Sequence, residues 1–413
     1  MDIVPIKFEK VVSSGKALGK TSGKVVFCYG VLPGEIAEVK FVNEKKDYIE
    51  AELVNITRPS IFRIPPKEKH YLNCSPWQTI NYDYQLDLKK NITEEAIFQT
   101  VKKDIKLDFF YKSHSIYGYR TKIEYKLENS GRNLKYAFYK RGTKNLVPLE
   151  RGCALIDDGV NRLAYKLLDF INSLNIDRKA LDRFVFRKGT NGEVLGIIYL
   201  NCKIDEIILP KIENLVGLVA IAENDKQIYG QEFIEQDLLD TQIKYGYDCF
   251  FQNNIELFSK VLEIVRSEIG SARKIVDLYS GVGSIGLSLR DFADKIVLVE
   301  SFRNSYLYSV KNIKALGARN VVPILSNSER VSENILKESD VIILDPPRAG
   351  AEKMLLEKIL KALPGKIVYL SCNPVTLGRD LSILLKRYTI KKIYGFDFYS
   401  NTVHTETLVF LER

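Results

Sequence analysis

The chain has 413 residues, of which 46% are hydrophobic and 11% aromatic, and this composition excludes a disordered or fibrous protein. The length predicts two or three domains, each large enough to bury a core. The net charge is +9, and no run of residues approaches the ~18 consecutive apolar residues of a membrane span.

The N-terminal segment MDIVPIKFEKVV lacks the apolar core of a signal peptide. The cysteines are scattered without a CxxC pair, which is typical of free thiols in a reducing compartment; they are Cys28, Cys74, Cys153, Cys202, Cys249 and Cys372. We therefore expect a cytoplasmic protein that does not contact a membrane, and we expect it to be a monomer.

Residues 1–57 have the pattern of a small all-β module. Short β-rich runs at 23–29, 35–42 and 48–56 are separated by turns at Gly15, Gly30 and Pro33-Gly34, and a five-stranded barrel fits this spacing. The segment Ser14–Gly19, followed by Val31–Glu35, resembles the TRAM domain, a small RNA-binding barrel of the OB type. A barrel with a purely structural role remains the alternative.

Residues 58–250 are expected to form a central α+β domain that binds RNA. Pro59, Pro65 and Pro66 mark a linker, residues 84–110 have a helical pattern, and residues 182–200 predict two strands joined by a glycine-containing turn. The helical part of 84–112 could pack on the following domain. Residues 100–190 contain 20 Lys and Arg against 10 Asp and Glu, interleaved with aromatic residues. Such a surface can contact phosphates and stack on bases, although an ordinary solvated face has the same composition.

Residues 251–413 alternate strands with helices of 10–15 residues, which predicts a doubly wound parallel sheet of the Rossmann-like type. The strands are expected at 274–279, 295–300, 320–325, 340–344 and 366–370. Two strands close together at the end, 390–399 and 406–411, predict an antiparallel hairpin. Dehydrogenase sheets do not usually end in this way, whereas methyltransferase sheets do.

A glycine-rich turn follows the first of these strands. Gly281-x-Gly283-x-x-Gly286 matches the dinucleotide fingerprint, and Glu300 ends the next strand, where a carboxylate can accept hydrogen bonds from both ribose hydroxyls. NAD sites and S-adenosylmethionine sites share this arrangement. The loop alone therefore leaves both cofactors open, together with a tight turn that binds nothing.

Two further strand ends carry reactive groups. Asp345 begins an Asp-Pro-Pro-Arg loop that two prolines stiffen, so its carboxyl group should project beside the cofactor cleft. Cys372 follows the next strand and precedes a helix, a position that can lower the pKa of a thiol. A thiolate that attacks carbon 6 of uracil makes carbon 5 nucleophilic toward a methyl group. A base must then remove the carbon-5 proton, and Glu406 is the first candidate and His404 the second.

These motifs in combination resemble the RNA uracil-5 methyltransferase family, which uses S-adenosylmethionine to form 5-methyluridine in tRNA and large-subunit rRNA. The resemblance covers nearly the whole chain, through Phe251-Gln252-Asn253, the loop 277–286, Asp345–Arg348, Ser371–Pro374 and His404–Glu406. It implies Cys372 as nucleophile and Glu406 as proton acceptor. It implies cofactor contacts at Gln252, Tyr279, Ser284, Glu300 and Asp345, and the glycine-rich loop adds Gly281 and Gly283, whose backbone can approach a ligand closely. The alternatives are an NAD-dependent oxidoreductase and a non-catalytic RNA-binding protein.

One departure from the family concerns metal. Many relatives hold a 4Fe–4S cluster with a C-x5-C-x2-C run and a distant fourth cysteine, whereas the corresponding stretch here keeps Cys74, with Cys153 as a remnant of the fourth ligand. Two thiolates cannot hold a cubane that needs four ligands. We therefore expect no cluster and no metal site, with Trp77 and its neighbours filling the space.

Overall fold

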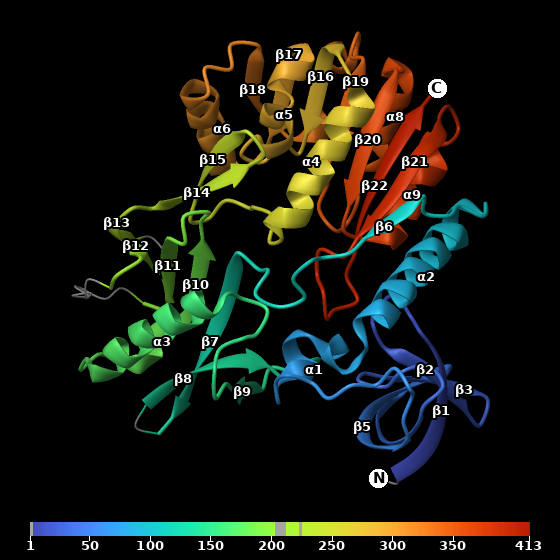
Figure 1. Cartoon of the computed structure of the whole chain (residues 1–413), viewed down its shortest axis with the longest axis vertical. Coiled ribbons are helices and arrows are strands. Elements are labelled where there is room, and N and C mark those ends of the chain that lie inside the picture. Colours follow the sequence, from blue (N-terminus) through green and yellow to red (C-terminus); the bar gives the residue numbers. More distant parts are fainter. Residues whose placement is uncertain (1–2, 132, 203–211, 223–224) are drawn as a thin grey trace.

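The computed structural model describes residues 3–131, 133–202, 212–222 and 225–413. These residues form a closed barrel, a seven-stranded sheet, a two-stranded hairpin and an eight-stranded sheet, which confirms the predicted α/β class with an N-terminal barrel. Figure 1 shows the barrel at one end of the molecule and the eight-stranded sheet at the other, with the seven-stranded sheet beside them. No described helix is long and apolar enough to cross a membrane.

The barrel closes in the order β1-β2-β3-β5-β4. Alternate residues of its strands, among them Ile6, Phe8 and Val39, point inward and form one apolar core. The turn between β1 and β2 approaches the C-terminal half of the chain, since a Cβ on Gly15 would lie 3.2 Å from the side chain of Val403. The strands are β1 (Ile3–Val11), β2 (Ala17–Thr21), β3 (Lys24–Cys28), β4 (Ile36–Glu44) and β5 (Tyr48–Arg58).

A long helix connects the barrel to the C-terminal sheet. After α1 (Tyr71–Cys74) and a 3-10 turn, η1 (Pro76–Thr79), helix α2 (Tyr82–Val101) begins at Asn81, whose side chain accepts hydrogen bonds from two backbone N–H groups of the first turn. It packs against α9 (Pro374–Leu384), where a Cβ on Gly378 would lie 3.2 Å from the Cα of Ile97. The predicted helix through residue 110 is wrong beyond Val101, because Lys102 adopts a left-handed conformation and the chain becomes extended in β6 (Phe109–Tyr111).

The central sheet has the order β13-β12-β11-β10-β7-β8-β9, and α3 (Asp158–Ser173) packs its apolar face on it. The two strands predicted within 182–200 are confirmed as the antiparallel pair β10 and β11. The strands are β7 (Lys122–Ser130), β8 (Asn133–Tyr139), β9 (Leu146–Pro148), β10 (Leu181–Lys188), β11 (Val194–Leu200), β12 (Leu215–Ala222) and β13 (Asp225–Gly230), with η2 (Arg178–Ala180) before β10. The hairpin β14 (Phe233–Leu238) and β15 (Thr241–Gly246) follows.

The C-terminal sheet has the order β18-β17-β16-β19-β20-β22-β21-β6. Helices α4, α5 and α6 cover one face, and α7, α8 and α9 cover the other together with α2. The strands are β16 (Ala272–Leu278), β17 (Ala293–Glu300), β18 (Val321–Leu325), β19 (Val341–Leu344), β20 (Lys366–Ser371), β21 (Thr389–Phe396) and β22 (Glu406–Glu412). The helices are α4 (Ile255–Ile269), α5 (Ser284–Ser288), α6 (Arg303–Ala315), α7 (Glu333–Leu336), α8 (Lys353–Ala362) and α9 (Pro374–Leu384), with η3 (Arg290–Phe292) and η4 (Ser328–Arg330).

This strand order places the candidate site. The chain runs outward through β16, β17 and β18 and then returns to β19, which pairs with β16 in parallel. The order therefore reverses between β16 and β19, and ligands of open α/β sheets bind at such a reversal, beyond the carboxyl ends of the strands. The predicted antiparallel ending is confirmed, since β22 pairs antiparallel with both β20 and β21.

Candidate active site

The glycine-rich turn lies between β16 and α5. Gly281 and Gly283 have φ values of +56° and +88°, which favour glycine. A Cβ on Gly286 would lie 2.3 Å from the side chain of Leu298, so glycine lets α5 approach β17. Asp277 fixes the same turn, because its carboxylate accepts a hydrogen bond from the backbone N–H of Gly286 at 2.9 Å. Its complete burial raises the pKa of Asp277 to about 8.

Glu300 ends β17 and faces this turn. One carboxylate oxygen accepts a hydrogen bond from the backbone N–H of Gly281 at 2.8 Å, and the other accepts one from the N–H of Phe302 at 2.6 Å. Each oxygen of a carboxylate has capacity for a further donor. Glu300 can thus shape the loop and still accept hydrogen bonds from a ribose.

Tyr279 starts the turn with a φ of +60°, and its hydroxyl donates to Glu329 at 2.6 Å. Because the Tyr279 hydroxyl already forms this hydrogen bond, a ligand would contact the aromatic ring or the backbone of Tyr279 instead. The buried hydroxyl of the next residue, Ser280, has no hydrogen-bond partner among the described residues. Ser284 is half-buried as the first residue of α5.

Gln252 and Asp345 meet although 93 residues separate them. The side-chain amide of Gln252, just before α4, donates to the Asp345 carboxylate at 3.4 Å. The amide oxygen of Gln252 is buried and has no partner within the described part of the chain. Burial raises the pKa of Asp345 to about 7, and the hydrogen bond from Gln252 opposes this shift.

Cys372 lies half-buried between β20 and α9. Burial and the neighbouring carboxyl groups of Glu406 and Asp345 raise the pKa of this thiol to about 11, against the opposing effect of the Arg348 guanidinium. The predicted lowering of the thiol pKa is therefore wrong for the free protein.

Glu406 opens β22 and is buried, with 3% of its surface exposed. Burial and the nearby Asp345 raise the pKa of Glu406 well above its ordinary value, and Arg348 opposes this shift. His404 behaves in the opposite way, because burial and the positive charge of Arg348 lower its pKa to about 4. Cys372, Glu406, Asp345 and Arg348 therefore form one electrostatically coupled group. Arg348 was quoted in the sequence motif, but its part in this group was not foreseen.

A cavity of about 240 Å³ opens beside this group. Arg348, Cys372 and His404 line it from the C-terminal sheet, and Ser13 and Ser14 line it from the first turn of the barrel. The barrel therefore forms one wall of the cavity that contains the candidate nucleophile.

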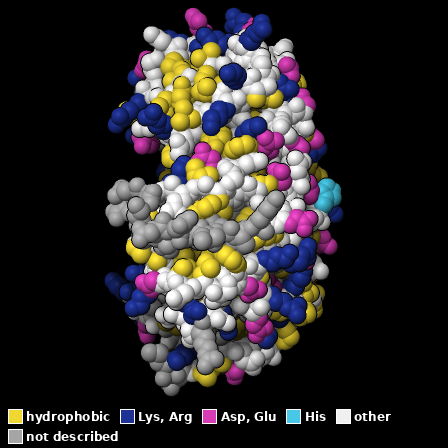
Figure 2. Space-filling model, turned by 90° about the vertical axis from the view of Figure 1, so that its left-hand side faces the viewer, with side chains coloured by type: hydrophobic (Ala, Val, Ile, Leu, Met, Phe, Trp, Pro, Cys, Tyr) yellow, Lys and Arg dark blue, Asp and Glu magenta, His cyan; other side chains and the backbone are white. Residues whose placement is uncertain are grey.

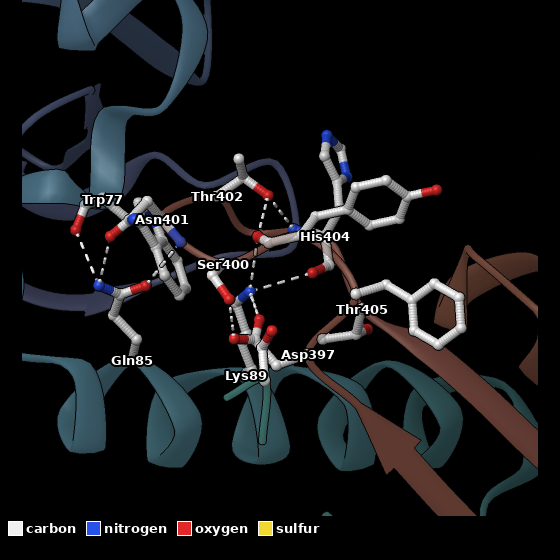
Figure 3. Close-up of polar contacts among 12 residues, drawn as sticks. Trp77, Gln85, Lys89, Asp397, Ser400, Asn401, Thr402, His404 and Thr405 are labelled. Carbon is white, nitrogen blue, oxygen red and sulfur yellow. Dashed lines mark hydrogen bonds and ion pairs between the residues drawn. The ribbon is translucent and has the colours of Figure 1, made fainter. Parts of the chain in front are cut away.

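The loop 397–405, which joins β21 to β22 and contains His404, is fastened to α2 (Figure 3). Lys89 of α2 is completely buried and forms an ion pair with Asp397. Its ammonium group also donates to the backbone carbonyls of Tyr399 at 3.0 Å and His404 at 3.1 Å. A buried cation thus holds both ends of the loop that precedes Glu406.

A second set of contacts in Figure 3 fixes the tip of the same loop. The side-chain amide of Gln85 donates to the Asn401 side chain at 3.1 Å and accepts from the Asn401 N–H at 3.0 Å, while the N–H of Trp77 donates to the Asn401 carbonyl at 3.1 Å. Sequence reasoning missed Lys89 and Gln85. The available signal was polar residues at the four-residue spacing of one helix face, Gln85, Lys89 and Thr93.

The expectation for the cluster region is partly wrong. Trp77 does not fill the space beside Cys74, because it packs with Val11 and Leu32 of the barrel and with α2. Cys74 and Cys153 lie in a separate cluster, and the described part of the chain provides two thiols there rather than four.

The basic residues of 100–190 do not form a single solvated face. Arg120 and Lys122 are both partly buried; burial lowers the pKa of Lys122, and the Nε of Arg120 is buried without a hydrogen-bond partner among the described residues. Lys140 is exposed and pairs with Glu52 at 2.9 Å. On the side of the molecule shown in Figure 2, Lys and Arg side chains are interspersed with acidic ones.

Comparison with known proteins identifies relatives along the whole chain. A family model described as tRNA (Uracil-5-)-methyltransferase matches residues 81–413. An uncharacterized RNA methyltransferase of Prochlorococcus marinus is 30% identical over 93% of this chain and 99% of its own length. Another, of Caldanaerobacter subterraneus, is 27% identical over 100% of this chain and 99% of its own.

The fold is also that of a solved structure. The Pyrococcus abyssi tRNA (uracil-54, C5)-methyltransferase, solved in complex with S-adenosyl-L-homocysteine, superposes with a TM-score of 0.79, covering 99% of this chain and 100% of that one at 24% identity. The matching family is one of methyltransferases, which decides between the two cofactors that the glycine-rich loop had left open. The chain belongs to the tRNA (uracil-5-)-methyltransferase family.

Proposed function

We propose that this protein transfers a methyl group from S-adenosylmethionine to carbon 5 of a uridine in tRNA or rRNA, with Cys372 as covalent nucleophile and Glu406 as proton acceptor. The observation that carries the proposal is that Asp345, Cys372 and Glu406 lie at the ends of neighbouring strands in the order β19-β20-β22, next to β16 and its glycine-rich turn, while Arg348 and Cys372 line one cavity. An NAD-dependent oxidoreductase would leave this group without a role.

The residues at the strand ends fit the cofactor. The buried amide oxygen of Gln252 and the buried hydroxyl of Ser280 have no partners in the described ranges, and unsatisfied buried polar atoms are rare unless a ligand or water pairs with them. Glu300 retains acceptor capacity beside Gly281 and Gly283, and Tyr279, Ser284 and Asp345 complete the proposed contacts. When bound, S-adenosylmethionine supplies an electrophilic methyl group.

The proposed covalent steps begin with loss of the Cys372 proton to solvent. The thiolate forms a bond to carbon 6 of uracil, and the electron pair of the carbon 5–carbon 6 double bond moves into the carbonyl system as an enolate. The enolate electron pair then forms the bond from carbon 5 to the methyl group, whose bond to the sulfonium sulfur would break, so that S-adenosylhomocysteine would leave. Glu406 accepts the carbon-5 proton, the sulfur–carbon 6 bond breaks, and its electron pair returns to Cys372.

Two observations favour Glu406 over His404 as the base. Ser371 of β20 pairs with Thr407 of β22, so the adjoining residues Cys372 and Glu406 lie close together, and Glu406 raises the pKa of Cys372. The pKa of His404 is lowered to about 4, so its imidazole is a weak base. Arg348 stabilises negative charge on either Cys372 or Glu406 and thereby supports both steps.

The proposed partner is RNA, bound by a single copy of the protein in the cytoplasm. We propose a TRAM-like barrel of residues 1–57, a central RNA-binding domain of residues 58–250 and a methyltransferase domain of residues 251–413. Ser13 and Ser14 of the barrel line the cavity beside Cys372, so RNA held by the barrel would lie next to the nucleophile.

The test is methyl transfer from labelled S-adenosylmethionine to unmodified tRNA and rRNA transcripts, followed by nucleoside analysis. We expect 5-methyluridine with the parent protein, none with Cys372→Ala, and normal formation with Cys202→Ala, which removes an exposed thiol that does not line the cavity. Methylation by the Cys372→Ala variant, or a different methylated nucleoside, would overturn the proposal.

A further inference from the structure

We propose that Glu68, His70, Cys74 and Cys153 bind one zinc ion, which ties the segment around α1 to the loop before α3. The four potential ligand atoms lie within 4.8 Å of one another, although no ion is present. This inference does not depend on the proposed methyl transfer.

The spacing of the group fits tetrahedral zinc. With bond lengths of ~2.0–2.3 Å, ligand atoms in a tetrahedral site lie roughly 3.3–3.8 Å apart. The Glu68 oxygen and His70 Nε2 are already 3.3 Å apart. Small side-chain rotations therefore suffice to close the site around an ion.

The group is enclosed and one of its nitrogen atoms lacks a hydrogen bond. Cys153 has 1% of its surface exposed, and His70 Nε2 is buried without a hydrogen-bond partner among the described residues. Zinc binds cysteine as the thiolate, so on binding it would displace the thiol protons of Cys74 and Cys153.

Contacts around the group hold the ligands in place, as second-layer contacts do in metal sites. The side-chain amide of Gln78 donates to one oxygen of Glu68 at 2.8 Å, and the N–H of Ala154 donates to the other at 2.6 Å. The hydroxyl of Ser75 lies 3.0 Å from the sulfur of Cys74. A cavity of about 480 Å³, lined in part by Glu68 and Cys153, gives an ion a route of entry.

The chemistry of the ligands selects zinc. Two sulfur atoms, one imidazole nitrogen and one carboxylate oxygen suit Zn²⁺, which accepts all three ligand types in closed four-coordinate sites. A 4Fe–4S cluster requires four cysteine thiolates, and this group offers two. A Cys74–Cys153 disulfide is the competing outcome and is distinguished by the test below.

The proposed zinc site would stabilise residues 118–120, which contact the loop 397–405. The backbone of Ala154 accepts a hydrogen bond from Gly118 at 2.8 Å, and Leu155 accepts one from Arg120 at 2.9 Å. Tyr119 lies between Gly118 and Arg120 in the chain, and its hydroxyl donates to the backbone carbonyl of Ser400 at 3.1 Å. Zinc at this place would therefore stabilise the loop 397–405 through the Tyr119 contact, which is separate from the contacts of α2.

The first test measures metal in the full-length protein after treatment with a chelator and titration with Zn²⁺. We expect about one zinc per chain, a rise in the melting temperature on binding, and protection of two thiols from a thiol reagent until chelator is added. Any of three results would overturn the inference: about four iron atoms per chain, a Cys74–Cys153 disulfide in protein purified under reducing conditions, or two free thiols whose reactivity Zn²⁺ does not change.

The second test compares Cys74→Ser and Cys153→Ser with the matched control Cys202→Ser, whose thiol is exposed and outside the group. Both ligand variants should lose stoichiometric zinc, and the control should retain it. If the ligand variants fail to fold, the titration of the parent protein still decides, since it needs no substitution.

Discussion

Replacing Lys89 by Met should destabilise the junction between α2 and the loop 397–405. Lys89 and Asp397 are both completely buried, so the substitution leaves a buried carboxylate without its cation. Breaking such a pair costs roughly 3–5 kcal/mol. The lower end applies here, because the hydroxyls of Tyr82 and Ser400 still donate to Asp397, at 2.7 and 2.5 Å.

The protein contains a single tryptophan, and it reports on this junction. Trp77 is 2% exposed, and its N–H donates to the carbonyl of Asn401. Urea unfolding followed by tryptophan fluorescence should therefore show the loss as a lower midpoint. Lys90→Met, on the exposed side of the same helix, serves as the control and should change stability by less than ~0.5 kcal/mol.

A double variant separates the charge from the packing. Lys89→Met with Asp397→Asn removes both charges, and such replacements are often neutral, so most of the lost stability should return. If Lys89→Met costs less than ~1 kcal/mol, or if the double variant is no more stable than the single one, the ion pair does not hold the loop. Methyl transfer should fall in Lys89→Met, because the carbonyls of Tyr399 and His404 lose their donor.

Three further predictions concern the reaction itself. Glu406→Gln should accumulate a methylated protein–RNA adduct that survives denaturing gels, because the carbon-5 proton is no longer removed. Cys372→Ala should form no adduct with 5-fluorouridine RNA. Normal turnover by Glu406→Gln would mean that another residue is the base. Adduct formation by the parent protein should rise about tenfold per pH unit between about pH 7 and 9, because the pKa of Cys372 is about 11 and the thiolate fraction grows with pH below it. Arg348→Met should slow that step at each pH, and a flat profile would contradict the assignment. Glu300→Ala should weaken S-adenosylmethionine binding by roughly 1.5–3 kcal/mol, measured by calorimetry, while Glu300→Gln should lose less; unchanged affinity in both would remove Glu300 from the site.

The C-terminal sheet was predictable because its signals are local. Each strand is a short apolar run between a helix pattern and a glycine or proline, and the observed strand bounds lie within three residues of the expected ones. The candidate residues lie at strand ends for the same reason, since the carboxyl ends of parallel strands meet at one edge.

The contacts that hold the site were not predictable from local patterns. Helix α2 buries Gln85, Lys89, Thr93 and Glu94 beside Leu88, Ile92 and Ile97, so polar and apolar residues share its inward face and blur the hydrophobic pattern. The ion-pair partner of Lys89 is 308 residues away in the chain. The raised pKa of Cys372 likewise depends on the approach of Glu406 and Asp345, which only the folded sheet creates.

The three-residue strand β6 constrains the order in which the protein can mature. Phe109–Tyr111 pairs with β21, and the carboxylate of Asp108 accepts the N–H of Ile393 at 2.7 Å, across 285 residues of chain. During synthesis β6 leaves the ribosome long before β21, so β6 stays unpaired until β21 has been synthesised. A fragment that begins at residue 251 would lack both this strand and the cover of α2, and would expose β21 as a free edge that can pair with other chains. The eight-stranded sheet therefore includes a strand, β6, from the first third of the chain and is covered by α2, which also precedes residue 251. We therefore expect that residues 251–413 do not fold as an independent domain.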